Sequence, residues 1–369
     1  MHIPFCAKKC SYCDFHFSTR FESYRDEMIE SIVKEIKQRR GEALNPLDSI
    51  YFGGGTPSLL TVEETTLLLK TIKENYQSNE NIEITLEVNP EDISKEKLRN
   101  WLKLGINRLS IGLQSFKKED LKWMNRGHTN EDALSCVSIA REVGFTNVSV
   151  DLMYGLPGLS QKEWQSHIDL VLDSGITHIS AYCLTVEKGT LLSAEVTKGN
   201  ITLPEDDVIE AQYNILIAHL KRSGFEQYEV SNFAFNKLYS QHNSSYWKGV
   251  NYIGVGPSAH SFKKGYRRWN VANNSAYIRS LKKGLGYYEE EFLSPKDLWN
   301  ELFLTGFRTK WGVLKDKIND LGGFTADERS LLEDSLKNQK VKELKDAYVL
   351  TDSGFLFADA LAQSFFRVQ

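Results

Sequence analysis

The first half of the chain alternates short β-rich runs with longer stretches of helical periodicity. Strands separated by helices of this length pair in parallel and are joined by right-handed crossovers. Six repeats predict an α/β fold, a six-stranded (β/α)6 partial barrel related to the closed TIM barrel, with functional groups gathered where the strands end. The β-rich runs are Met1–Phe5, Ser49–Phe52, Ile82–Val88, Arg108–Leu113, Asn147–Leu152 and His178–Leu184.

Three cysteines with the spacing C-x3-C-x2-C (Cys6, Cys10 and Cys13) lie near the start of the chain. Three thiolates can hold three irons of a [4Fe–4S] cluster, whereas four-cysteine ferredoxin runs ligate every iron. The fourth iron would keep an open position for chemistry. A zinc site or a disulfide pair is the alternative, but structural zinc sites usually have four ligands at paired spacings. The cysteines therefore predict an iron–sulfur cluster.

Composition excludes several classes of function. The chain has 45 Lys and Arg against 49 Asp and Glu, a net charge of −4, and no long run of either sign. Electrostatic binding to nucleic acid is therefore not expected. No run approaches the roughly 18 to 20 apolar residues of a membrane span, and no signal peptide precedes the cysteines. We expect a reducing cytoplasm, because oxidised thiols cannot ligate iron. Cys136 and Cys183 are expected to be buried core residues.

The pattern changes after about residue 200. A helix is predicted over 205–223, followed by a polar, aromatic-rich segment from Gln241 to Asn270. The segment Tyr348–Leu356 predicts two short strands around a Ser-Gly turn, followed by a helix. We therefore divide the chain into a partial barrel with the cluster loop (1–205), a linking segment (206–290) and a C-terminal winged-helix-like domain (291–369). This last domain has no basic stripe, which favours a packing or lid role over DNA binding.

The cysteine run, together with the glycine-rich turn Gly53–Pro57, resembles the radical S-adenosylmethionine (SAM) superfamily. The resemblance implies that the amino and carboxylate groups of SAM close the open iron. Glu87 and Asp151 are the clearest pocket candidates, because each interrupts a β-rich run that should be mostly apolar. The implied SAM-binding residues are Tyr12, Gly54, Gly55, Thr56, Glu87, Gln114, Arg126 and Asp151.

These residues have different implied roles. Tyr12 would lie beside the adenine, and the glycine turn would meet the methionine amino group, because glycine lets the backbone approach a ligand closely. Glu87 would pair with that ammonium or with the ribose, and Gln114 and Asp151 would bond to the ribose. Arg126 would bind the methionine carboxylate through its planar fork.

Further motifs resemble a narrower family, that of the oxygen-independent coproporphyrinogen III oxidases and the related HemW-type haem chaperones. Two features favour the HemW-type branch. Phe15 stands where the oxidases carry a further cysteine, and residues 242–247 match the chaperone motif H-N-x-x-Y-W. The motifs shared with the whole family are His2–Cys6, Gly53–Ser58, Tyr154–Pro157 and Gly254–His260.

The second resemblance implies a haem site. A histidine is a good axial ligand for haem iron, and aromatic side chains offer flat surface for a porphyrin. A structural histidine beside aromatic residues is the alternative interpretation. His260 is a second candidate iron ligand. The implied haem-binding residues are His242, Asn243, Tyr246 and Trp247.

The resemblance implies a cytoplasmic haem chaperone that carries a [4Fe–4S] cluster and SAM. It would pass haem to an acceptor, a respiratory haem enzyme at the membrane, and both a peripheral membrane association and a homodimer stay open. The alternatives are a coproporphyrinogen oxidase, which decarboxylates its substrate by radical chemistry, and a DNA-binding regulator. Family members carry a tyrosine two residues before the histidine of H-I-P-F-C. Met1 precedes His2 here, so we expect a start codon assigned too late or a truncated chain.

Overall fold

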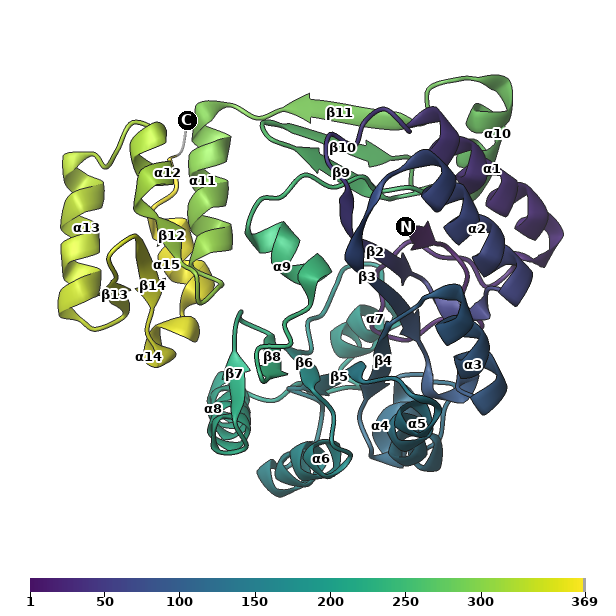
Figure 1. The fold of residues 1–369 in the computed structure, drawn as a ribbon. Helices are drawn as coiled ribbons and strands as arrows, with labels where there is room; N and C mark the ends of the chain where they lie inside the picture. Colours follow the sequence, from purple (N-terminus) through teal and green to yellow (C-terminus); the bar gives the residue numbers. More distant parts are fainter. Residues whose placement is uncertain (368–369) are drawn as a thin grey trace.

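The structure is a computed structural model that describes residues 1–367. Its largest sheet has eight strands in the order β1-β2-β3-β4-β5-β6-β8-β7, of which β1 to β6 are parallel (Figure 1). The six parallel strands coincide with the six predicted β-rich runs, which confirms the α/β class. They are β1 (His2–Ile3), β2 (Leu47–Gly54), β3 (Ser78–Val88), β4 (Arg108–Gln114), β5 (Asn147–Tyr154) and β6 (His178–Cys183).

Helices cover the outer face of this sheet (Figure 1). Helix α1 buries Ile29, Ile32 and Ile36, as its periodicity predicts. In α2, Leu68 and Ile72 are buried, whereas Leu67 is 44% exposed. The helices between the strands are α1 (Arg25–Gln38), α2 (Val62–Asn75), α3 (Lys95–Leu104), α4 (Lys118–Trp123), α5 (Asn130–Val143) and α6 (Gln161–Asp173).

Local sequence signals fix where many helices begin. Thr61 accepts a hydrogen bond from the Glu64 amide, and the Glu64 carboxylate accepts one from the Thr61 amide. This reciprocal pair satisfies two amide groups that the first helical turn leaves without partners. The same capping box opens α5, α6, α11 (Pro295–Gly306) and α13 (Ala326–Lys337).

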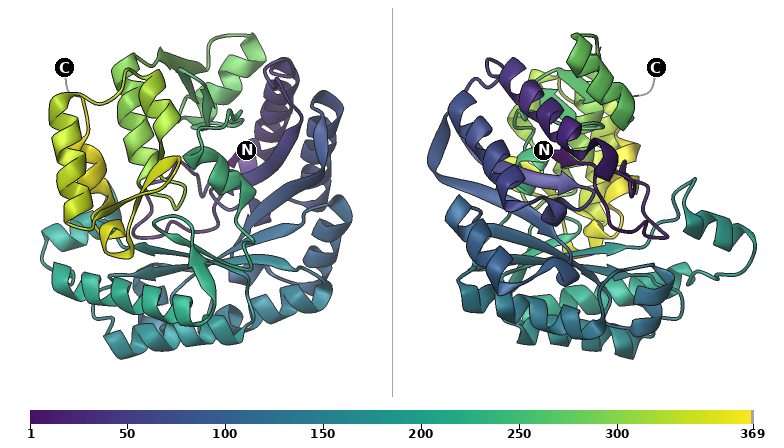
Figure 2. Two further views of the ribbon diagram at one scale, coloured as in Figure 1. Left: turned by 60° about the vertical axis from the view of Figure 1, so that its left-hand side comes forward. Right: turned by 90° about the vertical axis from the view of Figure 1, so that its right-hand side faces the viewer.

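Two antiparallel strands extend the sheet beyond the six predicted units. After α7 (Leu191–Thr197), whose segment projects from the body (Figure 2), α8 (Asp206–Arg222) matches the predicted helix. It leads into β7 (Phe225–Gln227) and β8 (Asn232–Phe235). Strand β8 pairs antiparallel with β6, so the parallel series ends there.

The aromatic-rich segment contains a short helix and a second sheet. Helix α9 (Gln241–Trp247) packs against β2. The carboxyl group of Glu35 on α1 is fully buried and accepts hydrogen bonds from Asn270 and from the Tyr277 hydroxyl, which attaches the second sheet to the barrel. The remaining elements here are β9 (His260–Lys263), β10 (Tyr266–Asn270), α10 (Asn274–Lys283) and β11 (Tyr288–Phe292).

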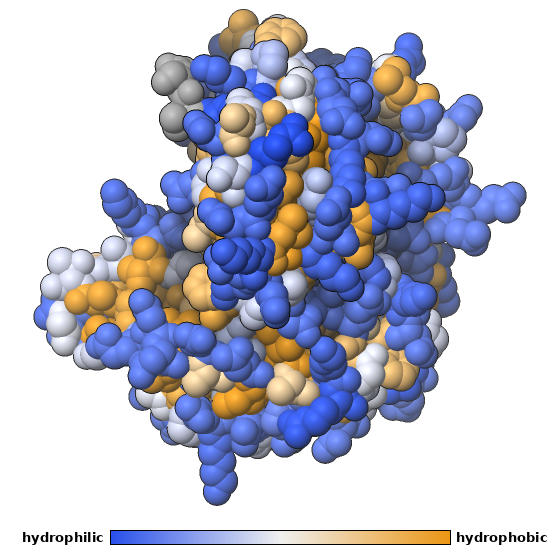
Figure 3. Space-filling view, turned by 90° about the vertical axis from the view of Figure 1, so that its left-hand side faces the viewer, coloured by the Kyte–Doolittle hydropathy of each residue, from blue (hydrophilic) through white to orange (hydrophobic). Residues whose placement is uncertain are grey.

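The C-terminal part has a separate hydrophobic core, built around Trp299, Phe303 and Phe365. Its three-stranded sheet has the order β12-β14-β13. Most of the surface on this side of the molecule is hydrophilic, with apolar side chains between the polar ones (Figure 3). The elements after α11 are β12 (Val313–Leu314), α12 (Lys315–Asp320), α13, β13 (Val341–Glu343), β14 (Ala347–Leu350), α14 (Asp352–Phe355) and α15 (Ala358–Ser364).

Of the two strands predicted around the Ser353-Gly354 turn, the first is confirmed as β14 and the second is wrong, while the helix after it is confirmed as α15. The hairpin lies earlier, where β13 pairs with β14. Thr351 follows β14 and accepts a hydrogen bond from the Gly354 amide, which starts the single turn α14. A Cβ atom on Gly354 would lie only 2.1 Å from the carbonyl oxygen of Lys340, so glycine is needed for this close approach. The Thr-x-x-Gly run is therefore a helix cap and not a strand turn.

No helix within residues 1–367 has the length and apolar character that crossing a membrane requires.

Candidate functional site

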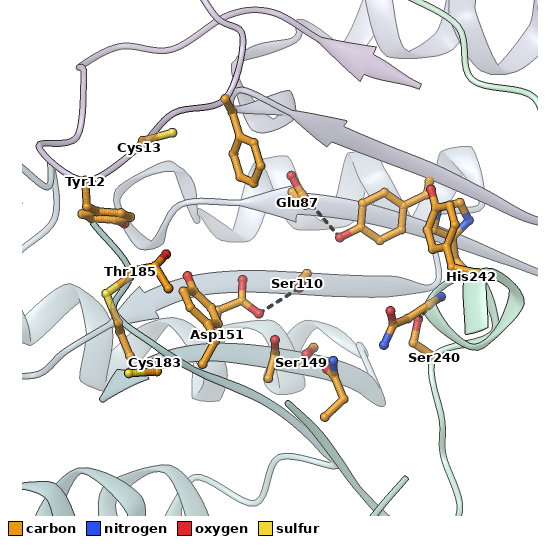
Figure 4. Close-up of a pocket in the computed structure, with 18 of the residues that line it drawn as sticks. Tyr12, Cys13, Glu87, Ser110, Ser149, Asp151, Cys183, Thr185, Ser240 and His242 are labelled. Carbon is orange, nitrogen blue, oxygen red and sulfur yellow. Dashed lines mark hydrogen bonds between the residues drawn. The ribbon is translucent and has the colours of Figure 1, made fainter. Parts of the chain in front are cut away.

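A cavity of about 590 Å³ occupies the inner face of the parallel sheet (Figure 4). Tyr12 and Cys13 lie at one end, His242 and Ser240 lie at the other, and Glu87, Ser110, Ser149 and Asp151 lie between them. Along β4 and β5 the wall residues alternate, because successive side chains of a strand point to opposite faces. The cavity therefore runs from the cysteine loop to α9.

The three cysteines lie on the loop after β1, and all three are free thiols. The Thr56 hydroxyl lies 3.5 Å from the Cys6 sulfur, and Nη1 of Arg126 lies 3.7 Å from the Cys10 sulfur. Hydrogen bonds and positive charge near the sulfurs stabilise ligating thiolates and tune the potential of an iron–sulfur cluster.

The donor set fits a [4Fe–4S] cluster. Residues 1–367 contain no group of three His, Cys, Asp or Glu side chains placed to ligate one metal ion. In a cubane cluster each thiolate binds a different iron, so its ligands need not converge on one point. Cys6, Cys10 and Cys13 would then be the protein ligands.

Glu87 and Asp151 line the middle of the cavity, as the sequence predicts. Glu87 accepts a 2.6 Å hydrogen bond from the Tyr51 hydroxyl, and Asp151 accepts a long one of 3.4 Å from Ser110. Burial, and then the charge of Glu87, raises the pKa of Asp151 to about 7, and burial raises the pKa of Glu87. Two carboxyl groups without an ion-pair partner among the described residues suit a cationic ligand such as SAM.

The glycine turn meets the N-terminal strand. The amides of Gly55 and Thr56 donate to the carbonyl oxygens of Ile3 and Phe5, and a Cβ atom on Gly55 would lie 2.5 Å from the Phe5 oxygen. Gly54 has φ +112° and faces the ring of His2. The close approach that needs glycine here is therefore to the strand that carries the cysteine loop. Contact with the methionine amino group stays a prediction.

Gln114 and Arg126 lie next to the cavity wall. The Gln114 side chain accepts a 2.6 Å hydrogen bond from Tyr182, whose ring lines the cavity. Nη2 of Arg126 donates to Asn89 and to the carbonyl oxygen of Gly112, while its Nη1 faces Cys10. The guanidinium is thus held beside the cysteine loop, where the methionine carboxylate of SAM is expected.

Helix α9 brings the other predicted site residues to the far end of the cavity. His242, Asn243 and Tyr246 line the cavity. The Glu83 carboxylate on β3 accepts hydrogen bonds of 3.0 Å from the amides of Gln241 and His242, which fixes the start of the helix.

His242 has hydroxyl groups at both ring nitrogens, with Ser49 Oγ 3.1 Å from Nδ1 and Tyr246 Oη 3.0 Å from Nε2. Its ring stacks on Tyr51 at 4.5 Å. Burial, and then the N-terminal ammonium, lowers the pKa of His242 to about 3. The imidazole is therefore neutral at physiological pH, which is the form that binds metals.

The structure does not bring every candidate to the cavity. Trp247 does not line the cavity wall. The Arg308 guanidinium lies 5.9 Å from the centre of the Trp247 ring. His260 is exposed on β9 and stacks on Trp269. Cys136 is buried in α5 as predicted, but Cys183 lines the cavity at the end of β6 instead of lying in the core.

Several wall residues escaped prediction, among them Tyr51, Arg108, Ser149 and Tyr182. The signal was present in the strands. Parallel strands that are covered on both faces read as continuous apolar runs, yet β4 carries polar residues at Arg108, Ser110 and Gln114. Polar residues two positions apart, such as Arg108 and Ser110, indicate that one face of the strand borders a polar space.

We expect the separate changes Glu87→Gln and Asp151→Asn to weaken SAM binding by about 1–3 kcal/mol each, the range for a hydrogen bond to a charged group. Equilibrium dialysis with SAM measures this. Asp92→Asn is the control, because Asp92 is a largely buried carboxyl bonded to Ser58 that does not line the cavity. Unchanged affinity in both pocket variants would contradict the placement of SAM.

The affinity for SAM should also depend on pH. A raised pKa means that Asp151 is protonated below about pH 7 and charged above it. We expect wild-type affinity to increase as the pH rises through this value, because the charged carboxylate is the better acceptor. The charged groups that act on Asp151 are Glu87, Arg108 and Arg126. Wild type and Asp151→Asn are titrated with SAM in parallel, because any pH dependence that comes from the ionisable groups of SAM is then the same for both. Equal pH profiles of the two proteins would contradict the placement of Asp151 in the SAM pocket.

Known proteins are similar to this chain over its first half and over its whole length. The family model described as the radical SAM superfamily matches residues 1–171. The heme chaperone HemW of Bacillus subtilis is 33% identical over 99% of this chain and 98% of its own length. HemW of Mycobacterium tuberculosis is 32% identical over 99% of this chain and 93% of its own length.

One further relative matches only part of this chain, and one solved structure matches nearly all of it. The mitochondrial radical S-adenosyl methionine domain-containing protein 1 of Danio rerio is 42% identical over 70% of this chain, and the match spans only 59% of that protein. Among solved structures, the coproporphyrinogen III oxidase HemN of Escherichia coli superposes with a TM-score of 0.84 at 23% identity, over 99% of this chain and 88% of that one. At this identity the likeness shows the shared fold alone.

Proposed function

The chain belongs to the HemW family of radical SAM proteins, and from this membership we propose that it is a haem chaperone, which binds haem and passes it to an acceptor protein. The full-length similarity to proteins named as heme chaperones supports the proposal. So does the H-N-x-x-Y-W motif, which lies on α9 at the cavity and not on a remote surface.

One observation carries this proposal furthest: the α9 residues and the cysteine loop line a single cavity. A haem that entered from the α9 side would therefore lie in the same cavity as SAM, next to the SAM pocket. Tyr246 is 41% exposed, which leaves this end of the cavity open to solvent. This arrangement supports a role in which the state of one site influences the other.

The cluster would be held by Cys6, Cys10 and Cys13, and when bound it supplies an open iron and one-electron chemistry. Other residues of the chain would position SAM. The cavity side chains Glu87 and Asp151 would bind the cationic and ribose parts of SAM. Haem binding does not require this chain to cleave SAM.

His242 is the proposed axial ligand. Its neutral ring can offer a lone pair to iron, and the nitrogen that does not bind iron keeps a hydroxyl partner. Such a partner orients a metal-binding imidazole and selects its tautomer. Tyr51 stacks on the ring and limits its rotation.

The alternative is an oxygen-independent coproporphyrinogen III oxidase, whose fold this chain shares. Phe15 argues against it. It occupies the position of the further oxidase cysteine and its side chain is 70% exposed. The alternative therefore has support from the fold but not from the residues of the loop.

Titration with haemin tests the proposed function. Protein with a reconstituted cluster is mixed anaerobically with haemin, and the Soret band is recorded. The same protein is incubated with coproporphyrinogen III, SAM and a reductant, and the porphyrin products are analysed. We expect a shifted Soret band and no decarboxylated product. Decarboxylation without haem binding would favour the oxidase.

We further propose that the acceptor is a respiratory haem enzyme, as the family resemblance implies. Haem-loaded chain is mixed with the haem-free form of such an enzyme, and recovery of the acceptor's spectrum is followed. Transfer that is no faster than from free haemin would contradict this part of the proposal.

A further inference from the structure

Arg108 is a buried cation in the wall of the cavity. It opens β4, and its side chain is only 3% exposed. Its Nε atom is buried without a hydrogen-bond partner, and no carboxylate among residues 1–367 forms an ion pair with its guanidinium. A guanidinium carries five N–H donors and cannot release its charge. The charge of Arg108 acts on the carboxyl groups of Glu87 and Asp151, but neither lies within ion-pair distance, so an anion in direct contact with the guanidinium would stabilise this buried charge.

The other two buried arginines among residues 1–367 both have a carboxylate partner. Arg39, which is also 3% exposed, lies 3.2 Å from Glu35 and 2.7 Å from Glu42. Arg268 bonds to the Tyr287 hydroxyl and lies 3.3 Å from Glu42. Neither of these arginines lines the cavity. The unpaired arginine is thus the one that faces the cavity.

Small polar side chains surround the same region of the cavity. Ser110 follows Arg108 by two residues, on the same face of β4, and pairs in register with Ser149 on β5. Ser240 and Asn243, from the start of α9, also line the wall. Hydroxyl and amide groups can donate hydrogen bonds to a carboxylate without filling the space that it needs.

The cavity wall therefore carries groups of both charges. Glu87 and Asp151 provide carboxyl groups, and Arg108 provides a positive charge that acts on both of them without direct contact. The SAM carboxylate is expected at Arg126, beside the cysteine loop, so SAM leaves Arg108 without an anion. A second ligand, bearing its own carboxylate, is needed to fill this position.

We propose that Arg108 binds a carboxylate of the ligand that enters from α9, in a subsite separate from that of SAM. This inference rests on the proposed function: for a haem whose iron meets His242, the carboxylate is a propionate. The planar fork of the guanidinium fits the two carboxylate oxygens. Arg108 would thereby fix the orientation of the ring relative to His242.

Esterification of the propionates provides the test. Haemin and haemin dimethyl ester differ in these carboxylates and share the iron and the ring. We expect wild type to bind haemin about 10- to 100-fold more tightly than the ester, the effect of one charged hydrogen-bonded pair. Arg108→Met should lose this preference while keeping its affinity for the ester. Arg108→Lys should keep part of the preference, because it retains the charge without the fork.

Arg268→Gln is the matched control, since it changes a buried arginine outside the cavity. It should lower the melting temperature, because it loses hydrogen bonds to Tyr287 and Glu42, and it should keep the preference for haemin. Arg108→Met should melt no lower than wild type without ligand, because no residue in the range 1–367 forms a hydrogen bond or an ion pair with the guanidinium. A marked loss of stability would reveal a structural partner and overturn the proposal.

Two outcomes separate this inference from the proposed function. If Arg108→Met retains the full preference for haemin, the carboxylate binds elsewhere and the Arg108 subsite is rejected while haem binding stands. If wild type binds neither haemin nor its ester, the proposed function fails, and the propionate assignment fails with it.

Discussion

Changing Cys10 to serine should abolish the iron–sulfur cluster. Cys6, Cys10 and Cys13 are the three thiols of the loop, and within residues 1–367 the remaining two cysteines lie on α5 and β6. No thiol of the loop is left to replace the lost ligand. Arg126 would then face a hydroxyl group in place of a thiolate. Anaerobic reconstitution, followed by iron and sulfide analysis and the visible absorbance of the cluster, measures the loss.

Cys136→Ala is the control for this experiment, because it removes a buried thiol far from the loop. It should retain the wild-type content of iron and sulfide. Full cluster content in Cys10→Ser would contradict the assignment of the three ligands. Equal losses in both variants would point to a general effect of thiol removal.

The second large effect is expected from His242→Ala, which should remove most of the Soret shift and leave the absorbance of the cluster intact. His242 contacts Ser49, Tyr51 and Tyr246 and none of the cysteines. The two cofactors should therefore be lost independently, although their residues line one cavity. Anaerobic titration of the reconstituted variant with haemin, with both absorbance bands recorded, measures the effect.

Two variants serve as controls for the histidine. His260→Ala should bind haem as wild type does, because His260 is exposed outside the cavity. Trp247→Ala should change stability more than haem affinity, since Trp247 does not line the wall. An unaltered spectrum in His242→Ala would reject ligation there, and a loss in His260→Ala would transfer the role to that residue.

The parallel sheet could be predicted because its signals are local. Each strand is a short β-rich run and each helix has its own periodicity and cap, so six units could be located one by one. The C-terminal hairpin was misplaced because a local signal was misinterpreted. Thr351 and Gly354 form a helix cap, and a turn between strands uses similar residue types.

The cavity wall was harder to predict because it depends on register. Glu87 and Asp151 stood out as acids within apolar runs, but Arg108 and Ser149 lie at strand positions that only pairing with neighbours brings to the inner face. Trp247 shows the opposite error. Its place beside Tyr246 in the motif suggested the same wall, but consecutive residues on a helix point in different directions, so only Tyr246 reaches the cavity.

The edges of the three sheets bear on how copies of this chain can associate. An unpaired strand edge is a template for another chain, and long apolar edges promote aggregation. Within residues 1–367 the large sheet ends at β1, of two residues, and β7, of three, and the C-terminal sheet ends at strands equally short. The longest of these edges, β11, carries Glu289, Glu290 and Glu291 in succession on a fully exposed strand. Like charges there would repel a second copy, so a homodimer would have to form through side-chain surfaces and not through a continuous sheet.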